Sequence, residues 1–297
     1  MKKLMLGNEA VARGAYEAGV KVVSSYPGTP STEITEFAAT YKEMNCEWAP
    51  NEKVAAEVAF GVAMAGARSM TCMKHVGVNV AADPLFTAAY TGVRGGMAVV
   101  CADDPAMHSS QNEQDSRYYA RAAHIPMLEP SNSQECKDFT KLAYELSEKY
   151  DTPVFVRLTT RIAHARSAME VSEREDVPVK PYARDFMKYV MMPGMARKRH
   201  VTVEARMKAL AEDADTLSVN RVEMGGTDLG IICSGVAYTY VKEALPEASV
   251  LKLGMVHPLP KKMIEDFAKK VARLVVIEEL EPVIEQQVAS FGIPVEG

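Results

Sequence analysis

Short apolar runs alternate with segments of helical pattern along the first part of the chain. Strands are predicted for the apolar runs at 20–25, 46–49, 68–73, 97–102, 127–129 and 153–158. Helices are predicted between them at 7–19, from about Ile34, and at 51–66, 83–92 and 133–149, with Asn8 as a cap and Gly19 and Gly66 as ends. Such alternation predicts an α/β fold with a parallel sheet covered by helices.

The stretch from Asn51 to Val80 is the one around which the rest is organised. Its helix consists mainly of Ala, Val and Gly, so a neighbouring backbone or a flat ligand can approach closely. Glu52 stands at its first turn, where the helix dipole favours an acid. The apolar run 68–73 follows, and we expect a glycine-containing turn at 74–80. A ligand could lie between the start of this helix and the end of that strand, where open parallel sheets keep their sites.

Two polar loops leave the predicted strands at the same edge. The segment from Tyr26 to Glu33 contains two prolines and Gly28, with Ser31 or Thr32 as a cap for the next helix. It could hold the Thr29 hydroxyl and nearby N–H groups for an anion or carboxylate, or it could be an ordinary turn. Residues 103–117 form a long loop with little apolar content, and such loops are usually functional or disordered.

The pattern changes after Arg161. Residues 164–215 are rich in charge, and we expect a mostly helical surface connector over 166–226 between a domain at 1–165 and a smaller α/β domain at 227–297. In the smaller domain, strands are predicted at 228–235, 249–253 and 274–277. The basic run at 196–200 could contact a phosphate, although a solvated face is the commoner role for such a run.

Composition narrows the classes of function. The chain has 297 residues, 47% hydrophobic and 25% charged, which suits two globular domains. Its apolar stretches are too short for a membrane span or a secretory signal, so we expect a cytoplasmic protein. A net charge of −5 gives no general reason to bind nucleic acid or an anionic membrane. The five cysteines are widely spaced, which argues against a zinc or iron–sulfur site on this chain and for reduced thiols.

Several motifs occur in an order that resembles one enzyme family. They are Tyr-Pro-Gly-Thr-Pro-Ser-Thr-Glu at 26–33, Asn-Glu-Lys-Val-Ala-Ala at 51–56, Lys-His-Val-Gly-Val-Asn at 74–79, Val-Arg-Gly-Gly-Met at 93–97, Asp-Asp-Pro at 103–105, Asn-Glu-Gln-Asp-Ser-Arg at 112–117, Gly-Met-Val-His-Pro-Leu-Pro at 254–260 and Glu-Glu-Leu-Glu-Pro at 278–282. The chain resembles the 2-oxoacid:ferredoxin oxidoreductases, specifically the indolepyruvate:ferredoxin oxidoreductase alpha subunits. This resemblance implies a parallel-sheet thiamine-diphosphate pyrimidine-binding domain followed by a smaller transketolase-C-terminal-like α/β domain.

The resemblance also implies roles for individual residues. In that family a glutamate bonds N1′ of the thiamine aminopyrimidine and favours the imino tautomer that removes the thiazolium C2 proton, and its position here matches Glu52. Without the resemblance, Glu52 reads as an acid that complements the helix dipole. Thr29 matches a threonine near the substrate carboxylate, and the resemblance implies a catalytic role for His75, either orienting substrate or exchanging protons. The resemblance implies cofactor contacts at Tyr26, Pro27, Gly28, Glu52, Val76 and Asn79. Substrate contacts are predicted at Thr29, His108, Gln111, Gln114 and Arg117, and no metal ligand is assigned.

Two expected parts of such an enzyme are missing. The chain has no Gly-Asp-Gly, the motif through which Mg²⁺ holds the diphosphate, and no cysteine-rich module. We therefore expect a shared thiamine diphosphate site, with Mg²⁺ and [4Fe-4S] clusters on missing domains or partner chains. The expected partners are a diphosphate-binding domain or subunit, an iron–sulfur/ferredoxin module, a gamma/beta-type subunit, CoA and a 2-oxoacid. An oligomer is expected, from either a split subunit or a truncated chain.

The implied reaction is oxidative decarboxylation of indolepyruvate or another aryl pyruvate to an acyl-CoA, with electrons passed to ferredoxin. Three alternatives stay open. The chain could belong to a related oxidoreductase acting on 2-oxoglutarate or another 2-oxoacid. It could be a non-catalytic docking protein with the same fold, or part of an acyl-transferring thiamine enzyme without redox centres.

Overall fold

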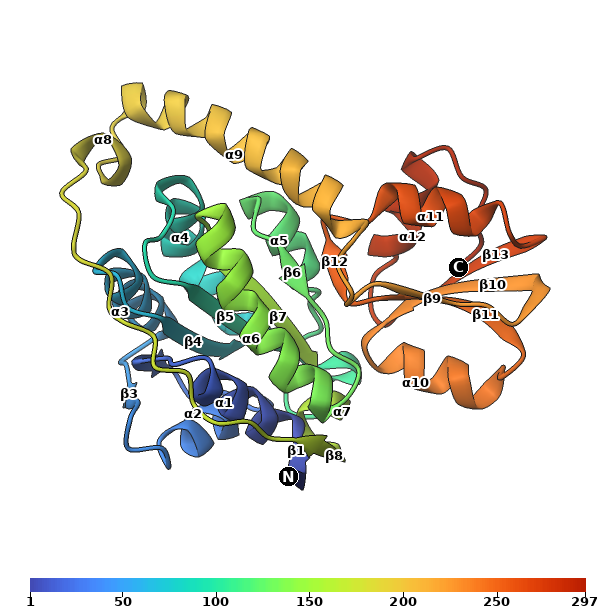
Figure 1. The fold of residues 1–297 in the computed structure, drawn as a ribbon, viewed down its shortest axis with the longest axis horizontal. Coiled ribbons are helices and arrows are strands. Elements are labelled where there is room, and N and C mark those ends of the chain that lie inside the picture. Colours follow the sequence, from blue (N-terminus) through green and yellow to red (C-terminus); the bar gives the residue numbers. More distant parts are fainter.

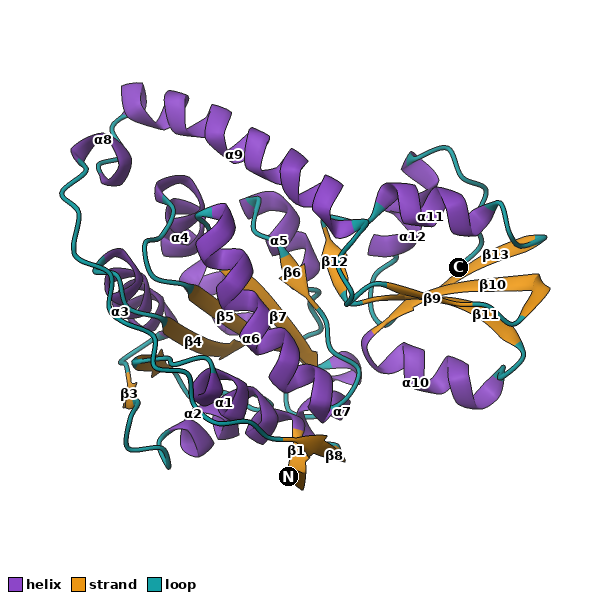
Figure 2. Ribbon diagram, viewed as in Figure 1, coloured by secondary structure: helices purple, strands orange, loops and turns teal.

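A seven-stranded sheet forms the centre of the larger lobe in the computed structural model, which describes residues 1–297 (Figures 1 and 2). Its strand order is β12-β6-β7-β5-β4-β2-β3. The strands are β2 (Val22–Ser25), β3 (Asn45–Trp48), β4 (Ser69–Lys74), β5 (Met97–Asp103), β6 (Met127–Leu128), β7 (Val154–Thr159) and β12 (Met255–His257). All are parallel except β12, which pairs antiparallel with β6. The parallel sheet and the strands predicted from the sequence are confirmed.

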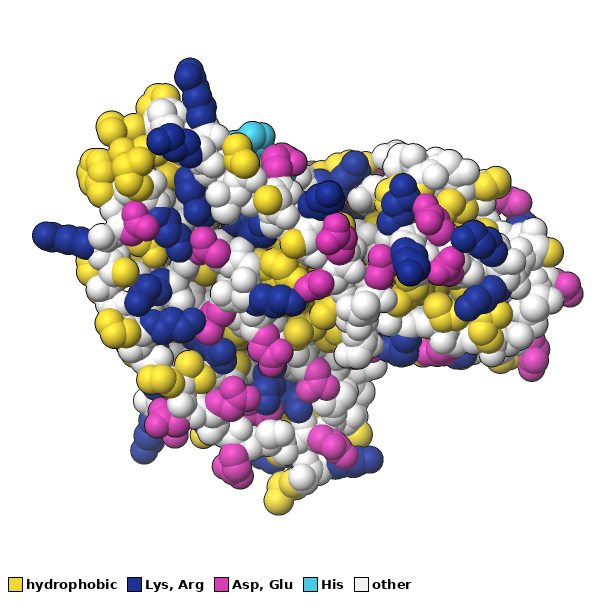
Figure 3. Space-filling model, turned by 45° about the horizontal axis from the view of Figure 1, so that its top comes forward, with side chains coloured by type: hydrophobic (Ala, Val, Ile, Leu, Met, Phe, Trp, Pro, Cys, Tyr) yellow, Lys and Arg dark blue, Asp and Glu magenta, His cyan; other side chains and the backbone are white.

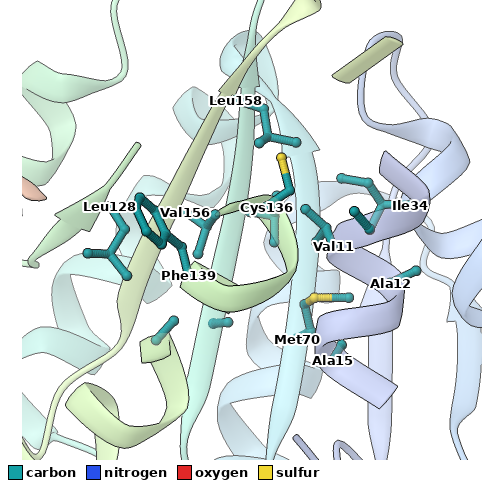
Figure 4. Packing of buried hydrophobic residues seen from close by; sticks show 14 of the residues in the cluster. Val11, Ala12, Ala15, Ile34, Met70, Leu128, Cys136, Phe139, Val156 and Leu158 are labelled. Atoms are coloured by element: carbon teal, nitrogen blue, oxygen red, sulfur yellow. The ribbon is translucent and has the colours of Figure 1, made fainter. Parts of the chain in front are cut away.

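Helices cover both faces of this sheet because its strands are apolar on both sides. On one face lie α1 (Gly7–Glu17), α2 (Thr32–Ala38) and α6 (Ser133–Tyr150), and on the other α3 (Glu52–Met64), α4 (His75–Thr91) and α5 (Arg117–Ala123). Along β5, Ala98 and Val100 face the first layer, whereas Val99 and Cys101 face the second. Figure 4 shows the first layer, where residues of α1, α2 and α6 pack against β4, β6 and β7.

The smaller lobe is a four-stranded sheet of order β13-β10-β11-β9. It contains β9 (Arg221–Glu223), β10 (Gly226–Ser234), β11 (Ala248–Leu253) and β13 (Arg273–Ile277), with helices α10 (Gly235–Ala244), α11 (Lys261–Ala268) and α12 (Val283–Ser290). β13, β10 and β11 are parallel, and β9 runs antiparallel to β11. Ile232, Leu251 and Phe267 belong to the same apolar cluster as Ile125 and Met127 of the larger lobe. The two lobes therefore share one continuous core.

The chain is helical from His75 onward, so the prediction of a turn at 74–80 is wrong. Lys74 is extended and precedes the first turn of α4, which continues through Pro84 to Thr91. Gly77 and the small residues after it let α4 pack closely on α3, and this packing outweighs their weak helix propensity. The predicted caps are also wrong. Asn8 is buried and donates to the Pro30 carbonyl, and neither Ser31 nor Thr32 caps α2.

The connector is less helical than its charge suggested. The prediction of a mostly helical segment over 166–226 is wrong for its first part, where β8 (Arg166–Glu170) is followed by non-helical chain up to 185. β8 pairs antiparallel with β1 (Lys2–Leu6), a strand that the sequence analysis did not identify. Helices follow only at α8 (Phe186–Tyr189) and α9 (Pro193–Ala214), after the short α7 (Thr160–His164) that precedes β8.

The surface carries both signs of charge side by side (Figure 3). Exposed apolar side chains gather around α8, namely Tyr182, Phe186, Met187 and Met192. None of the helices combines the length and apolar character that crossing a membrane requires.

Candidate functional site

Glu52 lies at the first turn of α3, against the first turn of α4. Asn51 caps α3 by accepting a hydrogen bond from the Val54 N–H at 3.0 Å, which fixes where the helix begins. A Cβ built on Gly77 would lie 2.8 Å from Oε1 of Glu52, so the carboxylate rests directly on the glycine backbone. The side chain is half-buried, and its carboxylate makes no hydrogen bond or ion pair within the chain. It is therefore available to a ligand.

His75 follows β4 at the start of α4 and is buried, with 1% of its surface exposed. Its Nε2 lies 3.2 Å from the Asn112 carbonyl, whereas Nδ1 is buried without a partner. A buried ring nitrogen without a partner is costly unless a ligand or water satisfies it. The contact with Asn112 also couples α4 to the long polar loop.

The loop at 26–33 is fixed by its own side chains around Gly28. The Thr32 hydroxyl accepts from the Gly28 N–H at 2.9 Å, and Ser31 Oγ donates to the Gly28 carbonyl at 2.8 Å. Hydroxyls predicted to cap a helix thus clamp the loop instead. Tyr26, Pro27 and Thr29 are exposed at the rim, and the Ser109 hydroxyl donates to the Thr29 carbonyl at 3.3 Å.

The loop at 103–117 is anchored at its start. The Asp104 carboxylate accepts from the Thr160 hydroxyl at 2.6 Å, the Ser110 hydroxyl at 2.7 Å and the Ser109 N–H at 2.8 Å. Burial acts to raise the pKa of Asp104, but these hydrogen bonds outweigh it and lower the pKa to about 2. The loop therefore starts from a fixed point, and its exposed part begins beyond this residue.

Arg117 does not face the loop's open side, and the prediction that it binds substrate is contradicted by its contacts. It is 1% exposed and pairs with Asp115 and with Glu278 of the smaller lobe. It also donates to the carbonyls of Glu279 and Glu281 at 2.8 and 2.9 Å. Burial acts to lower the pKa of Arg117, yet it stays above its usual value because Asp115 lies beside it. Its donors are committed to joining the lobes.

A second buried arginine lies beneath the same loop. Arg157 of β7 donates to Asp103 at 2.7 Å and to Glu129 at 2.8 Å, and lies 3.8 Å from Asp115. Burial alone would lower the pKa of Arg157, but Glu129, Asp103 and Asp115 hold it well above its usual range. The sequence analysis missed this network, because an arginine within an apolar strand gives no sign of its partners.

The other predicted residues are spread over the rim. Val76 is half-buried and directly precedes Gly77, and the Asn79 amide oxygen accepts from the Tyr119 hydroxyl at 2.5 Å. Gln111 is exposed, and the Gln114 amide donates to Asn112 at 2.8 Å. His108 lines a different space. The structure thus places Glu52 and His75 at the starts of the adjoining helices α3 and α4, whereas Thr29 and Gln111 are exposed on their loops.

A cavity of about 610 Å³ lies between the two lobes and is lined by residues of both. His108, Arg161 and Tyr240 line it from three different segments, and the Arg161 guanidinium lies 6.0 Å from the centre of the Tyr240 ring. Arg161 makes no ion pair within the chain. Glu52 does not line this cavity, so the cavity is distinct from the surroundings of Glu52. No group of three or more His, Cys, Asp or Glu residues is arranged to hold a metal ion.

Comparison with known proteins places this geometry in a family. Residues 13–219 match the family profile described as "Pyruvate flavodoxin/ferredoxin oxidoreductase, thiamine diP-bdg". The chain belongs to this family. Members of the pyruvate flavodoxin/ferredoxin oxidoreductase family with curated names include indolepyruvate oxidoreductase subunit IorA of Archaeoglobus fulgidus, 44% identical over 98% of this chain and 49% of its own length. The subunit IorA of Methanothermobacter thermautotrophicus is 48% identical over the same shares. The chain thus spans about half the length of these relatives.

Solved structures share the fold of this oxidoreductase-family chain. The 2-oxoglutarate:ferredoxin oxidoreductase from Magnetococcus marinus, solved with 2-oxoglutarate, coenzyme A and succinyl-CoA, matches with a TM-score of 0.83 at 19% identity. The match covers 100% of this chain and 62% of that one. A split-gene transketolase matches with a TM-score of 0.61 at 16% identity, covering 98% of this chain and 85% of that one. These likenesses confirm the fold class that the sequence predicted.

Proposed function

We propose that this chain supplies the pyrimidine-binding half of a thiamine-diphosphate-dependent 2-oxoacid:ferredoxin oxidoreductase that acts on indolepyruvate or other aryl pyruvates. The main structural support for this proposal is the position of the Glu52 carboxylate, which lies against Gly77 and forms no hydrogen bond or ion pair within the chain. The family supports thiamine diphosphate, and the relatives named for indolepyruvate support the substrate class. A more distant relation, 2-oxoglutarate synthase subunit KorA at 32% identity over 57% of the chain, makes 2-oxoglutarate the second candidate.

The glycine at this edge lets a carboxyl come close to a helix start. Gly77 has no side chain, so the Glu52 carboxyl lies against its backbone and keeps its oxygens free for a ligand such as the pyrimidine. A bound thiamine would supply a carbon nucleophile and an electron sink for the carboxylate-bearing carbon. The role of Glu52 would be to hold a proton at the pyrimidine N1′, and the buried His75 Nδ1 would be satisfied by cofactor, substrate or an ordered water.

The proposed site is incomplete on this chain. A diphosphate-binding domain or subunit would bring Mg²⁺ and close the open side of Glu52, and an iron–sulfur module with a gamma/beta-type subunit would carry electrons to ferredoxin. Arg161 and Tyr240 in the cavity between the lobes offer a cation and an aromatic face, which suit the phosphates and base of CoA. We place the assembled enzyme in the cytoplasm.

Replacement of Glu52 tests the proposal. The E52Q variant, assembled with the diphosphate-binding half, is expected to lose at least about 100-fold in 2-oxoacid-dependent ferredoxin reduction, because the amide cannot share a proton with the pyrimidine. E57Q is the matched control, since Glu57 lies on the same helix and is exposed. Thiamine diphosphate binding by calorimetry is measured in parallel.

Other outcomes select the alternatives. If neither the chain nor its assembly binds thiamine diphosphate with Mg²⁺, the chain is a docking protein with this fold. Acyl transfer without ferredoxin in an iron-free assembly indicates a thiamine enzyme without redox centres. Faster turnover of 2-oxoglutarate than of aryl pyruvates moves the substrate to the second candidate.

A further inference from the structure

A cation would be needed beside the substrate carboxylate. Arg117, the cation that the sequence predicted for this role, is already paired with carboxylates of the chain. A 2-oxoacid carries its negative charge beside the reacting carbonyl, so a neighbouring cation would both bind and orient it. Arg117 and Arg157 are buried and paired with carboxylates, as described above. Lys53, next to Glu52, pairs with Asp83 at 3.0 Å. These three charges are already neutralised within the chain.

Lys74 is a cation at this edge without a counter-ion, as is Arg161, which lies in the separate cavity between the lobes. Lys74 is the last residue of β4 and stands directly before His75. Its Nζ donates to the Ser109 carbonyl at 3.1 Å, and it takes part in no ion pair. An ammonium has three donors, so two remain free. The nearby carboxylate of Asp104 is already held by hydrogen bonds from Ser109, Ser110 and Thr160.

Two loops hold the Lys74 side chain in place. Its Cδ and Cγ lie 3.1 and 3.2 Å from the position of a Cβ built on Gly28, so the aliphatic stem rests on the backbone of the 26–33 loop. The carbonyl that receives Nζ belongs to the 103–117 loop, and the Ser109 hydroxyl donates to the Thr29 carbonyl. The ammonium therefore lies between the loop that presents Thr29 and the loop that could cover a substrate.

We propose that Lys74 receives the carboxylate of the 2-oxoacid, in place of Arg117. This inference rests on the proposed function. Lys74 stands three residues before Gly77, and Glu52 of α3 lies against Gly77, so the ammonium and the carboxyl belong to the same strand-to-helix junction and the helix packed on it. A lysine is a compact charge on a flexible stem, so its ammonium can adjust to the position of a bound carboxylate.

The test uses the assembled enzyme with K74M, K74R and, as control, K208M, which alters an exposed lysine of α9 without an ion pair. K74M is expected to raise KM for aryl pyruvate about 10- to 100-fold, with a smaller change in kcat, because a charged hydrogen bond to the ground state is lost. K74R should recover part of the loss. Inhibition by the corresponding arylacetaldehyde, which lacks the carboxylate, should not change, and neither should thiamine diphosphate affinity.

A second variant leaves the charge of Lys74 in place and tests the position of its side chain. G28A places a methyl group against the Lys74 stem and is expected to raise KM for the 2-oxoacid by a smaller factor than K74M. Unchanged KM in K74M, with a wild-type assembly that turns over 2-oxoacids, overturns the role of Lys74 and leaves the proposed function intact. A wild-type assembly without thiamine-dependent turnover overturns the proposed function itself.

Discussion

Two glycines on neighbouring helices differ in what surrounds them. A Cβ at Gly77 would meet Oε1 of Glu52 at 2.8 Å and Cβ of Met73 at 3.0 Å, whereas a Cβ at Gly61 would meet nothing within 4 Å. Both stand in helical segments, α4 and α3, so their intrinsic cost to the helix is similar. Gly77 is therefore explained by the close approach of Glu52, and Gly61 is not required by any contact within the chain.

This difference gives a paired prediction. G77A is expected to displace the Glu52 carboxylate and to lower turnover of the assembled enzyme by about 100-fold, because such small misplacements are costly. G61A is expected to leave turnover unchanged and to stabilise the chain by about 0.5–1 kcal/mol through helix propensity. Steady-state kinetics and urea unfolding check both variants. Equal activity in the two would remove the positioning role of Gly77.

At this scale a sequence motif can indicate a position, but it cannot indicate tertiary contacts. Glu52 and Thr29 were predicted because they lie in motifs; they follow the neighbouring parallel strands β3 and β2, and their roles stay predictions. Arg117 had the right chemistry for a carboxylate, but its burial depends on residues more than 160 positions away. Lys74 passed unnoticed, since a lysine at a strand end has no local signal that separates a binding residue from a solvated one.

The link between the lobes depends on a few elements rather than on the connector. Arg117 opens α5 and contacts the segment after β13, and β12 adds to the edge of the seven-stranded sheet beside β6. Truncating the arginine would leave Asp115 and Glu278 buried without their counter-charge. The R117M variant is expected to lower the free energy of unfolding by about 3–5 kcal/mol.

Urea unfolding of R117M beside R184M checks this expectation. Arg184 is exposed and makes no ion pair, so its loss should change stability by no more than about 0.5 kcal/mol. Native-like stability of R117M combined with a raised KM would restore the substrate-binding role that the sequence suggested for this residue.

Elements with local signals were predictable, and elements that depend on remote partners were not. The strands of the larger sheet follow apolar runs, and α3 and α6 have Asn51 and Asn132 as caps. In contrast, β1 and β8 are short and mostly exposed, and each becomes a strand only through the other. The start of α4 was missed because Gly77 suggested a turn, whereas packing on α3 makes it helical.

At the scale of the whole molecule, contacts outside the connector also join the two lobes. Three kinds of contact join residues up to 184 with residues after 184. They are the apolar cluster that spans both lobes, the pairing of β6 with β12, and the ion pair of Arg117 with Glu278. Limited trypsin digestion is expected to cut first after Arg184, which is exposed in a non-helical segment.

The two fragments should still elute together in size-exclusion chromatography. Separation of the fragments under native conditions would show that the lobes are held mainly by the covalent connector. The domain boundaries at 165 and 226 remain a prediction, which the sites of later cleavage would refine.

The pairing of β1 with β8 has a consequence for synthesis on the ribosome. Leu6 pairs with Arg166, so the first strand leaves the exit tunnel long before its partner exists. At cellular rates of translation the delay is on the order of 10 s, during which residues 2–6 have an open edge. The nascent chain must therefore keep this edge from other polypeptides until β8 has emerged. The strand begins with two exposed lysines, Lys2 and Lys3. Their charges protect the open edge from pairing with other chains.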